Sequence, residues 1–137
     1  MRSIRHPGPP ARERESVAPC RAHPLALSLR AGLSVNAAVT GALADAGFSS
    51  GYARLDGVAI EPMRYVIPAA APDASHAAWY SDTRAPAGAA ATERAGVVAG
   101  IRDGAPFIHC HGVWREEGGA RRAGHLLPHD AVVARDA

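Results

Sequence analysis

The chain has 137 residues, about the length of one domain, and 47% of them are hydrophobic but only 5% aromatic, so small side chains must fill its core. Its formal net charge is +2 and its isoelectric point about 8.8, below the value of about 9 above which dedicated nucleic-acid-binding domains usually lie. No apolar run approaches the roughly 20 residues of a membrane-spanning helix, and the N-terminus lacks a signal-peptide core, so we expect a cytoplasmic protein.

The first 21 residues contain four prolines and five arginines and no periodic apolar pattern. We expect them to form an extended N-terminal arm over residues 1–21, followed by a single domain over residues 22–137. At the start of this domain, Leu25, Leu27 and Leu29 alternate with other residues, which predicts a half-buried strand.

A helix is predicted next. Ser34 is suited to cap its first turn and Gly47 to follow its last one. Between these two residues, apolar side chains recur at helical spacing. The face they define consists of Val35, Val39, Ala42, Leu43 and Ala46. We therefore expect a short amphipathic helix over residues 34–46 that packs against a sheet.

The rest of the chain reads mainly as short strands. They are predicted at 50–60, 62–67, 94–101, 106–115, 121–127 and 131–133, and residues 68–92 form a long surface excursion. Many short strands with one helix, and no alternation of strands and helices, predict an α+β fold built on an antiparallel sheet.

Two histidines in one strand are the first sign of a metal site. His109 and His111 lie at positions i and i+2, so their imidazoles project from the same face of the strand. Cys110, between them, points to the opposite face, where a buried thiol is the expected outcome. Cys20 and Cys110 are too few and too far apart to form a disulfide framework.

A third histidine follows from the turn after this strand. An odd-length loop, either Glu117–Gly119 or Glu116–Ala120, places His125 opposite His111 on the same face, whereas an even loop would place it on the other face. Three neutral imidazoles suit zinc or a similar divalent metal and leave a fourth position for water or a substrate. The alternative is that these histidines only hydrogen-bond to neighbouring groups in the sheet.

Two other interpretations of this segment remain open. The spacing of Gly104, the two histidines and Glu116 resembles the first cupin metal motif, although the glycine stands one residue too close and the second cupin motif is missing. His129 could be a third or fourth ligand, but it follows Pro128 at the end of a strand, where its orientation is not predictable.

The same region resembles a known family. Residues 104–111, a glycine-rich turn and residues 123–127 are similar to the G-P-x-x-H-x-H and G-G-H-L core of the PPC domain (plants and prokaryotes conserved), and the likeness extends over about residues 23–134. It implies an α+β fold, a homotrimer, and a metal held by His109, His111 and His125. Bacterial members of this architecture are commonly labelled DNA-binding because the plant domain accompanies AT-hook motifs. This chain has no AT-hook core, and Ala123 replaces the first glycine of the G-G-H pair.

Residues outside the histidine motif suggest weaker hypotheses. His76, Trp79 and Tyr80, within the long excursion, could line a ligand pocket or cover a neighbouring subunit. Trp114 lies off the histidine face by strand parity and is expected to pack in the core. A cluster of arginines at 115, 121 and 122 is expected at a solvated hairpin end rather than at a phosphate site.

Two classes of function are consistent with these features. The first is a metal-binding trimeric module that recognises a small molecule or a partner, with DNA binding as a nominal role. The second is an enzyme that uses metal-held water, with cupin-like, hydrolase or lyase chemistry. Because Glu116 and Glu117 are expected at a hairpin tip, no general base is nominated, and we favour the module. The low net charge and the missing AT-hook predict that any DNA binding is weak and independent of sequence.

Overall fold

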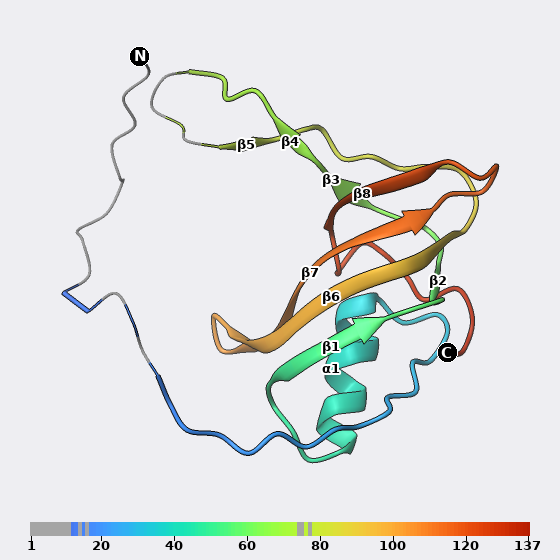
Figure 1. Ribbon diagram of the computed structural model, residues 1–137. Coiled ribbons are helices and arrows are strands. Elements are labelled where there is room, and N and C mark those ends of the chain that lie inside the picture. Colours follow the sequence, from blue (N-terminus) through green and yellow to red (C-terminus); the bar gives the residue numbers. More distant parts are fainter. Residues whose placement is uncertain (1–11, 14, 16, 74–75, 77) are drawn as a thin grey trace.

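The computed structural model describes residues 12–13, 15, 17–73, 76 and 78–137. A six-stranded antiparallel sheet forms its centre, and one helix lies against one face of that sheet (Figure 1). The elements in chain order are α1 (Val35–Asp45), β1 (Gly51–Leu55), β2 (Ala59–Ile60), β3 (Tyr65–Val66), β4 (Pro68–Ala69), β5 (Trp79–Tyr80), β6 (Ala90–Arg102), β7 (Ala105–Arg115) and β8 (Arg121–Leu126). The predicted α+β fold is confirmed.

The two longest strands, β6 and β7, occupy the middle of the sheet. The strand order is β1-β6-β7-β8-β3, with β2 also pairing with β6, and β4 and β5 form a separate two-stranded sheet. β7 pairs with β6 along its length and with β8 from His111 to Arg115, and β8 pairs with β3 at His125 and Leu126.

The helix begins and ends where the sequence predicts. The Ser34 hydroxyl accepts a hydrogen bond from the Ala37 N–H at 3.1 Å. At the other end Gly47 has a φ of +82°, and the Phe48 N–H donates to the Leu43 carbonyl at 2.9 Å. This Schellman arrangement satisfies carbonyl groups that the end of the helix leaves free.

The core lies between α1 and the inner face of the sheet. Its fully buried members from the helix and the two central strands are Val35, Val39, Val97, Ile108, Cys110 and Trp114. One helix residue in this layer is polar and escaped the sequence analysis. Asn36 is buried, its Oδ1 accepts from the Ile108 N–H at 2.9 Å, and its Nδ2 donates to the Pro106 carbonyl at 3.3 Å.

The prediction of a strand at Leu25–Leu29 is wrong. This segment forms no strand, and only Leu29 pairs its backbone with another segment, through two hydrogen bonds to Ala137. The described residues of the predicted arm, 12–13, 15 and 17–21, also lie outside any helix or strand, and the remainder of the arm lies outside the described residues.

Four other boundaries differ from the prediction. The 50–60 strand is divided at Gly57, whose φ is +75°, so that β1 and β2 pair with different parts of β6. The 62–67 strand is reduced to the two residues of β3, and 131–133 makes only isolated bridges at Val132 and Val133. The 68–92 excursion contains the β4–β5 hairpin and the start of β6.

Candidate metal site

The three predicted histidines come together on the outer face of the sheet, opposite the helix. Pairing of β7 with β8 places His111 directly across from His125, as the odd-loop register predicts. The turn is closed by a hydrogen bond from the Glu116 N–H to the Ala120 carbonyl at 2.8 Å, and Gly119 within it has a φ of +88°. Only glycine adopts this backbone conformation at low cost, so the loop sequence sets the register that aligns the histidines.

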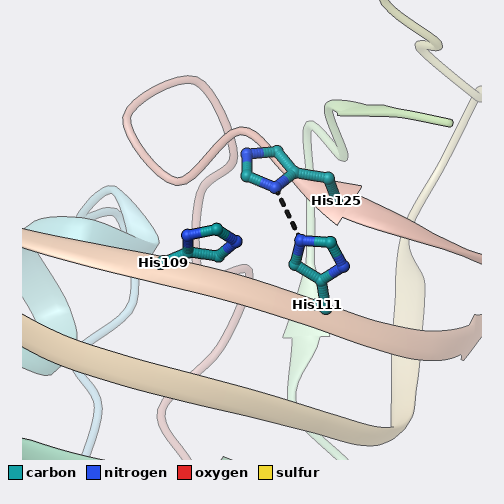
Figure 2. Close-up of side chains that lie close together, drawn as sticks. All are labelled: His109, His111 and His125. Carbon is teal, nitrogen blue, oxygen red and sulfur yellow. Dashed lines mark hydrogen bonds between the residues drawn. The ribbon is translucent and has the colours of Figure 1, made fainter. Parts of the chain in front are cut away.

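The side chains of His109, His111 and His125 converge (Figure 2). One ligand nitrogen from each lies within 4.8 Å of the others. The closest pair is His125 Nδ1 and His111 Nε2, which share a hydrogen bond of 2.9 Å, one ring donating and the other accepting. Each pair of ring centroids is 4.8 Å apart. The group could hold a metal ion.

The electrostatics of the site favour neutral imidazoles. Partial burial lowers the pKa of His111, and the neighbouring His109 lowers it further. Burial also lowers the pKa of His125, with added repulsion from His111 and then His109. A divalent metal binds the neutral form of histidine, so these shifts match the donor chemistry that such an ion requires.

The ligand nitrogens are spaced on the scale of a tetrahedral metal site. Zinc–nitrogen bonds of about 2.0–2.1 Å place the ligand nitrogens of a tetrahedral site roughly 3.3–3.4 Å apart. The nitrogens here range from the 2.9 Å hydrogen-bonded pair to separations within 4.8 Å.

Cys110, between the two histidines of β7, and Trp114, three residues beyond them, are buried in the core. Cys110 is buried on the opposite face of β7, and burial raises the pKa of its thiol to about 12, so it is neither a ligand nor a nucleophile. Trp114 is also buried there, and its ring packs edge-on against Tyr65 with centroids 4.7 Å apart. Both placements agree with the strand parity in the sequence.

Of the three residues singled out in the 68–92 excursion, one lies at the site. The ring of Tyr80 is 5.5 Å from that of His125. Trp79 instead packs edge-on against His76, with centroids 4.7 Å apart. His129, the other possible ligand, lies outside the group, with its ring 5.8 Å from that of Phe107.

One residue near the site, Tyr52 on β1, was not predicted from the sequence. Its hydroxyl lies 3.1 Å from the point that a Cβ of Gly96 would occupy. Gly96 pairs directly with His111 across β6 and β7. No local signal in the sequence could reveal this contact, because it depends on the pairing of strands distant in the chain.

The arginines at the hairpin end, at positions 115, 121 and 122, are paired with carboxylates. Glu93 accepts hydrogen bonds from Arg115 at 2.6 Å and from Arg121 at 2.5 Å. Arg122 lies 3.7 Å from Glu116. The bond from Arg121 is the main cause that lowers the pKa of Glu93, and the cluster is already neutralised in part by the chain's own acidic groups.

Comparisons with known proteins bear on the fold. No family model and no curated protein matches the chain. Among solved structures it is similar to a crystal structure from Ralstonia eutropha JMP134 described as "Putative DNA-binding protein", with a TM-score of 0.51 and 17% sequence identity over 79% of this chain and 67% of that one. At this identity the likeness concerns the fold alone.

In the described part of the chain, no helix is long and apolar enough to cross a membrane.

Proposed function

We propose that the protein is a metal-binding module that holds one divalent ion per chain, best suited to zinc, through His109, His111 and His125. The observation that carries this proposal is the convergence of three imidazoles from two adjacent strands. Three histidine ligands leave one position of a tetrahedral ion open, where the ion would act as a Lewis acid toward a bound small molecule.

The chain's own residues prepare this site in two ways. The pairing of β7 with β6 and with β8 holds the three Cβ atoms in place, so little backbone freedom is lost when an ion binds. The hydrogen bond between His125 and His111 keeps two ligand nitrogens facing each other. The motif similarity supports assignment to the PPC family, and the likeness in fold to the Ralstonia protein is compatible with it.

The positions of the nearby glutamates favour a binding module over an enzyme. Glu116 accepts a hydrogen bond from Tyr65 at 2.9 Å, and the carboxylate of Glu117 lies against Gly88. Neither carboxylate is directed at the histidines, so neither is placed to remove a proton from a group bound there. The cupin alternative loses support as well, because a single main sheet with one helix is not a double-sheet jelly roll.

We further propose that DNA binding, the role suggested by the family likeness, is weak and independent of sequence. The net charge is only +2, and Arg115 and Arg121 are both bonded to Glu93. Neutralisation of phosphates supplies most non-specific affinity for DNA. Fluorescence anisotropy with labelled duplexes tests this, and a sub-micromolar, sequence-selective complex at physiological salt would contradict it.

The assembly that we propose is a homotrimer in the cytoplasm. The outer face of the sheet, not covered by the helix, exposes Val98, which is 60% accessible. Trp79, on β5, is exposed beyond its edge. Burial of such apolar surface in a closed ring is a stable arrangement that does not polymerise. The two free thiols, Cys20 and Cys110, are compatible with a reducing compartment.

Metal analysis tests the proposed function. The wild-type protein, loaded with zinc and then freed of excess metal, is expected to retain one ion per chain. His111→Ala is expected to lose most of the bound zinc, because two imidazoles bind zinc much more weakly than three. His129→Ala is the matched control, since His129 lies outside the group, and it is expected to bind as wild type does. Equal metal content in wild type and His111→Ala would rule out the site.

A further inference from the structure

The sheet around the histidines is almost free of acidic side chains. Its six strands contain one acidic residue, Glu93, which is bonded to Arg115 and Arg121 at the hairpin end. Asp56, just beyond β1, is paired with Arg54. Three neutral imidazoles add no negative charge. A divalent ion in this site would therefore keep its full charge, which an anionic ligand would balance.

A hydroxyl donor lies on one side of the histidines. Gly96 has no side chain, and the Tyr52 phenol occupies that space, with its hydroxyl 3.1 Å and its Cε2 3.6 Å from the position of a Gly96 Cβ. Directly paired Cβ positions on antiparallel strands lie about 4.5–5.5 Å apart, and Gly96 pairs with His111. The phenol thus lies beside His111 on the open face, and among the described residues its hydroxyl makes no hydrogen bond to the protein.

An aromatic ring lies on the other side. Tyr80 comes from β5, and its ring is tilted by 36° to that of His125 with centroids 5.5 Å apart. Tyr80 is exposed, so one face of its ring is available to a ligand. Tyr52 is on β1, at one edge of the order β1-β6-β7-β8-β3, and Tyr80 reaches the histidines from the separate β4–β5 hairpin, next to His125 on β8. The histidines, the phenol and the ring together offer a charge, a hydrogen-bond donor and an apolar surface.

We infer that the site recognises a small aromatic monocarboxylate. Its carboxylate would occupy the open position of the ion and accept a hydrogen bond from Tyr52, and its ring would pack against Tyr80. This inference rests on the proposed function, because without the ion the site offers no positive charge to bind the carboxylate. It assigns Tyr52 and Tyr80 to ligand recognition rather than to metal binding.

Cobalt-loaded protein provides the test, because the visible absorption of cobalt(II) changes when a ligand enters its coordination sphere. Titration with benzoate is expected to change the spectrum, whereas benzamide, its neutral analogue, is expected to have no effect over the same range. Acetate, which lacks the ring, is expected to bind more weakly than benzoate. Cobalt content is measured for every variant and is expected to stay at one ion per chain.

Three variants separate the contributions. Tyr52→Phe is expected to weaken benzoate about tenfold, the effect of losing one hydrogen bond to a charged group. Tyr80→Ala is expected to weaken benzoate but not acetate, and Tyr80→Phe, which keeps the ring, to stay within about twofold of wild type. Ile101→Ala removes an exposed apolar side chain at the far hairpin of β6 and β7 and is the control, expected to leave both affinities unchanged.

The outcomes distinguish this inference from the proposed function. If the protein binds no cobalt, both are wrong. If it binds cobalt but its spectrum does not respond to benzoate, or responds equally to benzamide, the inference is wrong and the metal site stands. Wild-type affinity for benzoate in Tyr52→Phe would likewise overturn the role of the hydroxyl.

Discussion

Along β7, residues one position apart meet opposite environments. His109 and His111 project from the open face, whereas Cys110 is 1% exposed beneath them in the core. The imidazoles therefore stay accessible to solvent and to an ion, and the thiol is shielded from both. This alternation is a direct result of the two-residue period of a strand.

The shielding of Cys110 predicts selective labelling. Burial raises the pKa of this thiol to about 12, above the value of about 8.5 expected for an unfolded chain, so at pH 8 the thiolate forms only after unfolding. Iodoacetamide is expected to label one thiol per native chain, the exposed Cys20, and two in denaturant. Cys20→Ser should remove the native labelling. Rapid modification of both thiols in the native protein would contradict the placement of Cys110.

The histidine site could be predicted at the residue scale because it depends on local rules. The spacing of His109 and His111 fixes their common face, and the loop length fixes the position of His125. Tyr52 could not be predicted in this way. Its place beside His111 depends on the pairing of β1 with β6 and on the missing side chain of Gly96, and neither is visible in the residues near the motif.

At the scale of elements, the helix is connected to the metal-site strand by one polar residue. Asn36 bonds both to the Ile108 N–H and to the Pro106 carbonyl, one to three residues before His109. Since Asn36 is 7% exposed, these backbone groups have little access to water. The helix thereby holds the start of β7 as well as covering the core.

Replacing Asn36 should therefore destabilise the fold. Asn36→Ala leaves a buried N–H without a partner, and we expect it to lower the free energy of unfolding by about 1–3 kcal/mol. Thr40→Ala is the control, because the Thr40 hydroxyl bonds only within the helix, to the Asn36 carbonyl, and its loss should cost less than about 0.5 kcal/mol. Urea unfolding followed by circular dichroism measures both. Equal midpoints and slopes for Asn36→Ala and wild type would contradict the role of Asn36.

Two glycines make a second test of packing. A Cβ on Gly112 in β7 would lie 2.5 Å from Ala95 Cβ and 2.7 Å from Ala95 Cα, so neighbouring backbone must shift. Gly112→Ala is expected to destabilise the protein by about 1–3 kcal/mol. Gly41 in α1 has nothing within 4 Å of that position, and Gly41→Ala is expected to stabilise it by about 0.5–1 kcal/mol. The midpoint temperatures of thermal unfolding of the two variants should shift in opposite directions from that of the wild type. A shift of the same sign in both would refute the packing described for β7.

Elements with local signals were predicted better than those without. The helix is bounded by Ser34 and Gly47 in the sequence as in the structure, since both act on neighbouring backbone groups. The leucine alternation before it predicted a strand that does not form. A strand needs a partner, and among the described residues Leu29 pairs its backbone with Ala137 alone, more than 100 positions away, which no local pattern can indicate.

At the scale of the whole molecule, the proposed trimer explains the surface that a single chain leaves open. One face of the sheet is covered by α1, whereas Val98 on the other face and Trp79 on β5 are exposed. The composition alone would have suggested a dimer, the commonest closed assembly. The PPC resemblance is what selects three subunits.

Light scattering tests the assembly. At low micromolar concentration we expect a mass of three times the 14.2 kDa chain. Trp79→Asp, which places a charge on an exposed aromatic position of β5, is expected to reduce that mass if the hairpin contacts a neighbouring subunit. A monomer mass for the wild-type protein would overturn both the trimer and this role of the hairpin.

Anomalous X-ray scattering would test the metal site most directly. Diffraction from zinc-loaded crystals, recorded above and below the zinc absorption edge, shows where the ion lies. We predict one anomalous peak per chain, bounded by His109, His111 and His125 at about 2.0–2.1 Å from one nitrogen of each. A crystal with no peak at these residues, or with its zinc held elsewhere on the chain, would contradict the account.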